Sequence, residues 1–148
     1  MKQEKQERTY HILLVEDNPD DIIFTGEALL DTPYDCVLKS ARDGIEAMEY
    51  LTRAFSYDGT PVPDLILLDL NLPRKSGLEF LEEVKADGRM RFVPVVVLTT
   101  SKAEDDIRRA YCHYANSYVV KPIDINEFIE LIRAVTGYWF SVSRLPGR

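Results

Sequence analysis

Short apolar runs alternate with amphipathic stretches along most of the chain, and this alternation restricts the folds that are open to it. Five such runs occur, at residues 10–15, 35–40, 65–68, 93–98 and 117–120. Several are apolar at nearly every position, which suits strands buried between two helical layers. Strands that alternate with helices imply a parallel sheet with right-handed crossovers and helices on both faces. The sequence therefore predicts an α/β fold with five strand–helix repeats.

Helix-start signals follow the predicted strands. Asn18 offers a capping side chain, and Pro19 then stands at the first helical position, where proline is favoured. Four later stretches place an oxygen-bearing side chain three residues before a glutamate, the spacing of a capping box. These four capping residues are Asp43, Ser76, Ser101 and Asp124. Their recurrence supports a helix after each strand.

Length and composition indicate one compact domain. The chain has 148 residues, 45% of them hydrophobic, and we expect a charged leader at 1–9, one domain at 10–136 and an aromatic tail at 137–148. A formal net charge of −7 disfavours a basic nucleic-acid-binding face, so no nucleic-acid partner is expected. No export signal or membrane-spanning window is apparent, which favours a cytoplasmic protein without a membrane partner. Cys36 and Cys112 lack metal-ligand spacing, and free thiols are favoured over a disulfide.

Chemically capable side chains follow four of the predicted strands. Glu16 and Asp17 follow the first strand, Asp69 follows the third, Thr99 ends the fourth and Lys121 follows the fifth. In an open parallel sheet, the functional crevice lies outside the carboxyl ends of the strands. We therefore expect these groups to gather at one edge of the sheet.

The expected set suits phosphoryl transfer. Clustered carboxylates repel one another unless a cation lies among them, and oxygen ligands suit a hard divalent ion such as Mg²⁺. A carboxylate can act as a nucleophile towards phosphorus. An ammonium such as that of Lys121 and a hydroxyl such as that of Thr99 can then stabilise the transferring phosphoryl group.

These residues stand in four blocks that resemble the motifs of response-regulator receiver domains. The blocks are residues 14–18 (Leu-Val-Glu-Asp-Asn), 67–73 (Leu-Leu-Asp-Leu-Asn-Leu-Pro), 94–99 (Pro-Val-Val-Val-Leu-Thr) and 118–122 (Tyr-Val-Val-Lys-Pro). The resemblance runs from about residue 10 to 135. It implies a flavodoxin-like (βα)₅ doubly wound parallel sheet with strand order 2-1-3-4-5.

The resemblance also implies a phosphoacceptor and a metal site. Asp69 would accept the phosphoryl group. Asp17 and Asp69 would bind Mg²⁺ together with the main-chain carbonyl of Asn71, and Glu16 would act mainly through a water. Glu16 departs from the family pattern, because many relatives have aspartate there.

The same resemblance implies a switch. Lys121 would pair with the carboxylate and then with the phosphoryl group, and Thr99 would donate its hydroxyl to a phosphoryl oxygen. Tyr118 resembles the aromatic switch residue that turns inward when Thr99 moves, although a plain core aromatic remains an equal alternative. The Lys121–Pro122 bond is expected to be cis, since X-Pro bonds tolerate that isomer at small cost.

Within the family, the chain is most similar to single-domain regulators of bacterial and cyanobacterial phytochromes. The features that indicate this are residues 70–73, 98–101, 115–118 and 138–140. They imply a phytochrome-type sensor histidine kinase as phosphoryl donor and a homodimer formed through the fourth and fifth helices, the fifth strand and the tail. With no room for an output domain, the protein would signal by binding a downstream protein that the sequence does not identify, or act as a phosphate sink. It would not be an enzyme beyond Mg²⁺-dependent phosphotransfer and autodephosphorylation.

Three other functions are weighed against this one. A metal-dependent phosphohydrolase would place Asp-x-Asp after the first strand, where this chain has Glu16-Asp17-Asn18. A flavin carrier would need a hydroxyl-rich or glycine-rich loop there, and an interaction module without phosphorylation would not need the whole acid–threonine–lysine set.

The end of the chain leaves two alternatives open. The apolar stripe of the last helix continues in register through Trp139, so Gly137 is expected to interrupt that helix rather than end it. Tyr138, Trp139 and Phe140 either fold back onto their own domain or dock on a second subunit.

Overall fold

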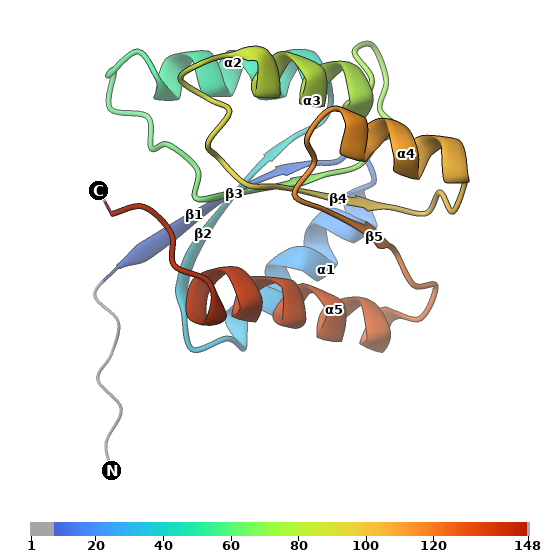
Figure 1. The fold of residues 1–148 in the computed structure, drawn as a ribbon. Helices are drawn as coiled ribbons and strands as arrows, with labels where there is room; N and C mark the ends of the chain where they lie inside the picture. Colours follow the sequence, from blue (N-terminus) through green and yellow to red (C-terminus); the bar gives the residue numbers. More distant parts are fainter. Residues whose placement is uncertain (1–7, 148) are drawn as a thin grey trace.

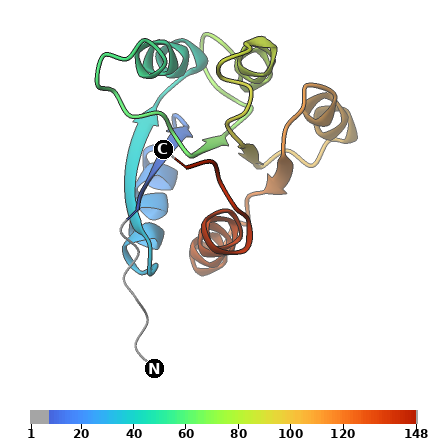
Figure 2. The same ribbon diagram turned by 60° about the vertical axis from the view of Figure 1, so that its left-hand side comes forward.

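The computed structural model describes residues 8–147 and confirms the predicted fold. These residues form a parallel sheet with strand order β2-β1-β3-β4-β5. The strands are β1 (Thr9–Val15), β2 (Asp35–Ala41), β3 (Leu65–Leu68), β4 (Val95–Thr99) and β5 (Ser117–Val120). The helices are α1 (Pro19–Leu30), α2 (Gly44–Ala54), α3 (Gly77–Ala86), α4 (Glu104–Cys112) and α5 (Ile125–Gly137). Helices α2, α3 and α4 cover one face of the sheet, and α1 and α5 cover the other (Figures 1 and 2).

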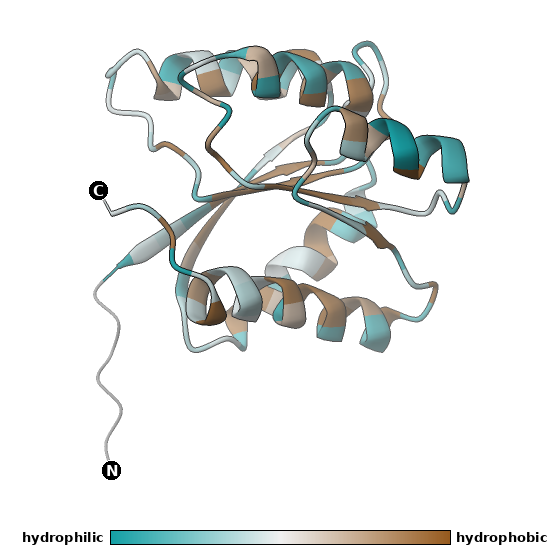
Figure 3. Ribbon diagram, viewed as in Figure 1, coloured by the Kyte–Doolittle hydropathy of each residue, from teal (hydrophilic) through white to brown (hydrophobic). Residues whose placement is uncertain are grey.

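Two apolar clusters lie on opposite faces of the sheet, because successive side chains of a strand point to opposite sides. In β1, Leu13 and Val15 belong to the cluster under α2 and α3, whereas Ile12 and Leu14 belong to the cluster over α1 and α5. The central strands β3 and β4 are buried at every position, and they appear as hydrophobic ribbons in Figure 3. Strand β2 lies at an edge of the sheet and alternates between exposed and partly buried residues. This explains why its sequence is more polar.

Most of the predicted helix caps are confirmed. The side chains of Asn18, Asp43 and Asp124 accept backbone N–H groups at the starts of α1, α2 and α5. Ser76 forms a complete capping box with Glu79 at the start of α3. These bonds satisfy N–H groups that the first helical turn leaves without a partner.

The predicted cap at Ser101 is wrong. Helix α4 begins at Glu104, and its N-cap residue Ala103 makes no side-chain cap bond. The Ser101 hydroxyl instead donates to Asp106 Oδ2 at 2.6 Å and accepts the Ala103 N–H at 3.3 Å. Ser101 therefore holds the β4–α4 loop against the first turn of α4 from outside the helix.

Asp43 combines its capping role with an ion pair. Its carboxylate accepts the Glu46 N–H at 2.9 Å and contacts the Arg74 guanidinium at 2.6 Å. Burial alone would raise the pKa of Asp43, but these partners outweigh it and lower that pKa below its usual value. The ion pair ties the start of α2 to the loop that follows β3.

The C-terminal aromatic residues divide between the core and solvent. Helix α5 ends at Gly137, whose backbone is still helical, and the chain continues directly into a π-helical turn, η1 (Tyr138–Val142). The helical path therefore runs on past Gly137, as the apolar stripe indicated, but it changes from α- to π-helical hydrogen bonding instead of being interrupted. Phe140 is buried and stacks on Tyr10 of β1 with ring centroids 4.1 Å apart. Tyr138 is half exposed. Phe140 thus folds back onto its own domain, while Tyr138 remains accessible.

Other expectations concern the termini, the cysteines and membrane segments. Residues 1–7 of the expected leader lie outside the described residues, and Thr9 already belongs to β1. Cys36 and Cys112 are free thiols, as favoured from the sequence. Within residues 8–147, none of the helices has the length and apolar character that crossing a membrane requires.

Candidate functional site

The polar residues that follow β1, β3 and β5 meet at the carboxyl edge of the sheet. Glu16, Asp17 and Asp69 each offer a carboxylate oxygen, and these oxygens lie within 4.8 Å of one another. Lys121 reaches the same cluster and donates to Asp69 Oδ2 at 3.3 Å. The structure therefore brings together four of the side chains that the sequence singled out.

Lys121 has three carboxylate partners. Its ammonium donates to Glu16 Oε1 and to Asp69, and also to Asp21 Oδ2 at 2.8 Å. Sequence reasoning did not include Asp21. Its position in the first turn of α1, directly after the capped loop that follows β1, is the signal that could have identified it.

The environment shifts the proton affinities of this pair. Burial raises the pKa of Glu16, and the hydrogen bond and charge of Lys121 oppose that effect only in part. Burial would lower the pKa of Lys121, but the hydrogen bonds to Asp21 and Glu16 and the charge of Asp69 raise it above its usual value. Lys121 therefore remains a cation within the cluster.

The donor set fits a hard divalent cation. Its members are oxygen ligands only, and Asp17 is exposed while Glu16 and Asp69 are buried. Such a cation prefers one or two carboxylates together with waters and a phosphate oxygen. Glu16 already accepts hydrogen bonds from Lys121 through Oε1 and from the Asn18 N–H through Oε2, the latter at 3.1 Å. Its two carboxylate oxygens thus have protein partners, which suits an indirect contact with a cation better than direct coordination.

The loop after β3 holds Asp69 in place. The Asn71 N–H donates to Asp69 Oδ1 at 3.3 Å, and the Gly77 N–H donates to the Leu70 carbonyl at 3.1 Å. A Cβ atom at Gly77 would collide with the Asp69 carbonyl oxygen and lie 2.6 Å from Leu70 Cα. Only glycine allows the start of α3 to approach the backbone of Asp69 this closely.

Thr99 and Tyr118 meet through the β4–α4 loop. Thr99 is fully buried at the end of β4, and its Oγ1 accepts the Ser101 N–H at 3.4 Å. The Tyr118 hydroxyl donates to the Ser101 carbonyl at 2.9 Å, and its ring packs against the cluster under α2 and α3. Ser101 is thus a partner of both predicted switch residues, and the sequence analysis had given it no part in the switch.

The expected cis bond before Pro122 is wrong. No peptide bond among residues 8–147 is cis, so Lys121 and Pro122 are joined by a trans bond. Trans is the intrinsically favoured isomer of X-Pro bonds, and Lys121 reaches its carboxylate partners with that isomer.

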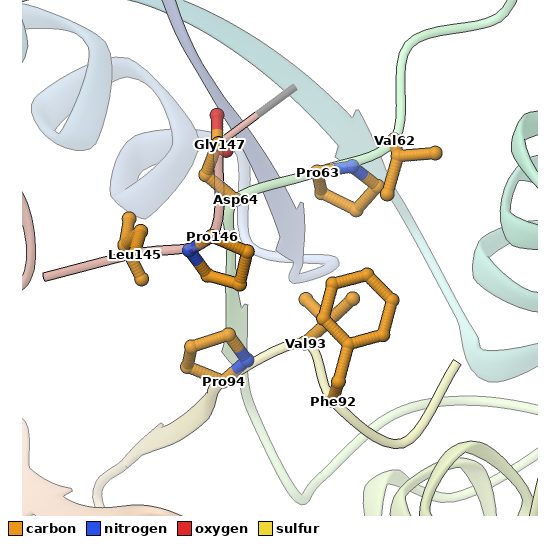
Figure 4. A pocket seen from close by; sticks show the side chains of 9 residues that line it. All are labelled: Val62, Pro63, Asp64, Phe92, Val93, Pro94, Leu145, Pro146 and Gly147. Atoms are coloured by element: carbon orange, nitrogen blue, oxygen red, sulfur yellow. The ribbon is translucent and has the colours of Figure 1, made fainter. Parts of the chain in front are cut away.

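A pocket lies at the opposite edge of the sheet, and none of its lining residues belongs to the acidic cluster. It has a volume of about 320 Å³ and is lined by residues 62–64, 92–94 and 145–147 (Figure 4). These segments precede β3 and β4 or belong to the end of the chain. Its carboxylate, Asp64, is paired with Arg8 at 2.6 Å. The pocket is therefore largely apolar and remote from the acidic residues.

Comparisons with known proteins agree with this geometry. Residues 12–133 match the family model of the response regulator receiver domain. Response regulator Rcp1 from Synechocystis sp. is 39% identical over 91% of this chain and 92% of its own length. The probable methanogenesis regulatory protein FilR2 from Methanothrix harundinacea is 38% identical over 95% of this chain and 90% of its own length.

Solved structures are also similar to the chain. The phosphorylated cyanobacterial phytochrome response regulator RcpA has a TM-score of 0.89 and 41% identity, covering 95% of this chain and 100% of RcpA. The Mn²⁺-bound form of Rcp1 has a TM-score of 0.86 and 38% identity, covering 93% of this chain and 99% of that structure.

Proposed function

This chain belongs to the response regulator receiver domain family and takes part in phosphorylation-based two-component signalling, and from this premise we propose that Asp69 is its phosphoacceptor. The observation that carries the proposal is the position of Asp69. A carboxylate oxygen of Asp69 lies within 4.8 Å of oxygens of Glu16 and Asp17 at the carboxyl edge of the sheet, and Asp69 accepts a hydrogen bond from the Lys121 ammonium. Asp69 is buried there, yet it keeps a cationic partner that could neutralise a transferred phosphoryl group.

The proposed reaction is a displacement at phosphorus. A carboxylate oxygen of Asp69 attacks the phosphorus atom of the donor, and an acyl phosphate bond forms. The bond between phosphorus and the donor breaks, and the leaving group takes the electron pair. A carboxylate nucleophile has no proton to lose on attack, so the step needs no general base. Lys121 stabilises the charge that develops on the phosphoryl oxygens.

We assign the divalent cation of this site to Mg²⁺, with Asp17, Asp69 and the Asn71 carbonyl as ligands and Glu16 in an indirect role. When bound, Mg²⁺ would neutralise charge between the carboxylates and the phosphoryl oxygens. The oxygen-only donor set supports this choice, and the Mn²⁺-bound form of Rcp1 shows that a similar protein holds a divalent ion.

We further propose that Thr99 and Tyr118 transmit phosphorylation to the surface around α4 and β5. A phosphoryl group brings strong acceptor oxygens next to the end of β4, where Thr99 can donate its hydroxyl. Both side chains share Ser101 as a partner, so a shift of Thr99 would alter the loop to which Tyr118 is bonded. The downstream partner would then distinguish the two loop positions.

The phosphoryl donor would be a sensor histidine kinase of the phytochrome type, acting in the cytoplasm. The similarity to RcpA, a cyanobacterial phytochrome response regulator, supports this choice of kinase. A homodimer is proposed through α4, β5, α5 and the tail. Large exposed apolar side chains support this surface, namely Tyr111, Tyr114, Ile125 and Tyr138. Gel filtration before and after phosphorylation would detect the dimer, and a screen of histidine kinases would identify the donor.

Incubation with acetyl phosphate and Mg²⁺ tests the phosphoacceptor directly. Intact-mass spectrometry should show one added phosphoryl group on the wild-type protein and none on the Asp69→Asn variant. Asp64→Asn is a control, because Asp64 is a buried carboxylate at the opposite edge of the sheet. A stable adduct on Asp69→Asn, or none on the wild type, would refute the assignment.

A further inference from the structure

Asp21 is a carboxylate that lies against the phosphorylation site without belonging to the expected acceptor, metal or switch residues. It stands in the first turn of α1, and its Oδ2 lies 2.8 Å from the Lys121 ammonium. The corresponding distance from Lys121 to Asp69 is 3.3 Å. In the structure, Lys121 is therefore closer to Asp21 than to the proposed phosphoacceptor.

The hydrogen-bonding capacity of Lys121 is filled by its carboxylates. A lysine ammonium has three N–H donors and no acceptor. The three partners of Lys121 are Glu16, Asp21 and Asp69, so each donor has one acceptor. A phosphoryl oxygen that binds Lys121 must therefore share or displace one of these contacts.

Exposure indicates which contact gives way. The side chains of Glu16 and Asp69 are 2% and 10% exposed, whereas that of Asp21 is 23% exposed. A buried carboxylate that loses its cation pays a large desolvation cost, but a carboxylate at the surface can be hydrated instead. Asp21 also lies at a helix N-terminus, where negative charge is favoured. Release of Asp21 is thus the least costly of the three.

We propose that Asp21 is a positioning residue that competes with the phosphoryl group for Lys121 and thereby slows the transfer of that group to Asp69. This inference rests on the proposed function of Asp69 and Lys121. In the unphosphorylated protein, Asp21 draws the ammonium towards α1. During transfer, it weakens the stabilisation that Lys121 gives to the phosphoryl oxygens, because one cation serves two neighbouring anions.

Substitution of Asp21 by asparagine tests the proposal, with the adjacent Asp20 as a matched control. Asp21→Asn keeps the shape of the side chain but replaces a charged acceptor by a weaker neutral one. Asp20→Asn removes the same charge from the same helical turn, and Asp20 makes no ion pair with Lys121 within the described chain. The conservative variant Asp21→Glu keeps the charge and should restore the behaviour of the wild type.

The measurement is the initial rate of phosphorylation by acetyl phosphate in Mg²⁺ buffer, followed by intact mass. Asp21→Asn should raise this rate about fivefold, the effect of losing one partly exposed ion pair. Asp20→Asn and Asp21→Glu should remain within about twofold of the wild type on the same scale. Urea unfolding of the unphosphorylated variants provides a separate readout for a merely structural role, which would change stability without changing the phosphorylation rate.

The possible outcomes separate this inference from the proposed function. If the wild type takes up a phosphoryl group but Asp21→Asn is phosphorylated at the rate of Asp20→Asn, or more slowly than the wild type, competition by Asp21 is refuted. The same conclusion holds if Asp21→Glu is phosphorylated as fast as Asp21→Asn. If the wild type takes up no phosphoryl group while Mg²⁺ is present, the proposed function itself fails, whatever residue stands at position 21.

Discussion

Replacement of Phe140 by alanine should destabilise the whole domain, because this tail residue is part of its core. Phe140 is 4% exposed, and its ring stacks on Tyr10 at 4.1 Å and meets Tyr34 edge-on at 5.8 Å. The Tyr10 hydroxyl also donates to the Phe140 carbonyl at 3.3 Å. These contacts attach the end of the chain to β1 and to the loop before β2.

The magnitude follows from the buried ring. Phenylalanine buries about 150–250 Å² of surface, which corresponds to about 4–6 kcal/mol at about 25 cal/mol per Å². Phe→Ala substitutions in protein cores cost about 3–5 kcal/mol, and the end of a chain can relax around the lost ring. We therefore expect Phe140→Ala to lower the free energy of unfolding by about 3 kcal/mol. For a domain of this size, the melting temperature should fall by about 6–12 °C.

Urea denaturation followed by circular dichroism at several protein concentrations would measure this effect. Val142→Ala is the matched control, because Val142 lies in the same turn and is 74% exposed, so its loss should cost less than about 0.5 kcal/mol. Equal unfolding midpoints for the two variants would show that the tail is not docked as described. A loss that appears only at high protein concentration would instead place Phe140 in a contact between subunits.

Three further predictions concern the elements that support the site. The pKa of Asp43 is lowered in the folded protein, so its carboxylate stabilises the fold above its unfolded pKa of about 4, and this stabilisation is lost as pH falls through the folded pKa. In the Asp43→Asn variant, the urea midpoint should therefore fall less steeply between about pH 5 and about pH 2.5 than it does in the wild type. Ser76→Ala removes the capping box of α3 and should cost about 1 kcal/mol in the same denaturation assay, and an unchanged midpoint would contradict this. Gly77→Ala should displace the backbone of Asp69 and slow phosphorylation by acetyl phosphate about tenfold or more, while Gly88→Ala, which has open space around its Cβ, should not.

The first acidic residue of the site illustrates how a small sequence difference changes local geometry. Glu16 stands where many receiver domains have aspartate, and its longer side chain reaches Lys121 from the end of β1. Only 2% of Glu16 is exposed, and burial raises its pKa, so the contact with Lys121 compensates only in part for the loss of water. The sequence predicted an indirect role for this residue but could not show that it shares Lys121 with Asp21.

The period of the apolar pattern determined the fold class, the number of strand–helix repeats and the edge of the sheet at which polar side chains gather. This was possible because strands buried on both faces must be apolar at successive positions, and because parallel strands end at a common edge. The sequence also determined where four helices start, because a capping residue bonds to N–H groups within three residues of itself. The four capping residues are Asn18, Asp43, Ser76 and Asp124.

Only the tertiary structure decided which side chains share a partner. The contacts of Lys121 with Asp21 and of Phe140 with Tyr10 join residues 100 and 130 positions apart, and no local periodicity specifies such pairs. The Ser101 cap was wrong for a more local reason, because its hydroxyl bonds to the Asp106 side chain while α4 begins only at Glu104. Local sequence patterns determine where helices and strands form. Which side chains contact one another depends on burial and on competition for a few charged partners, and both depend on the packing of the whole domain.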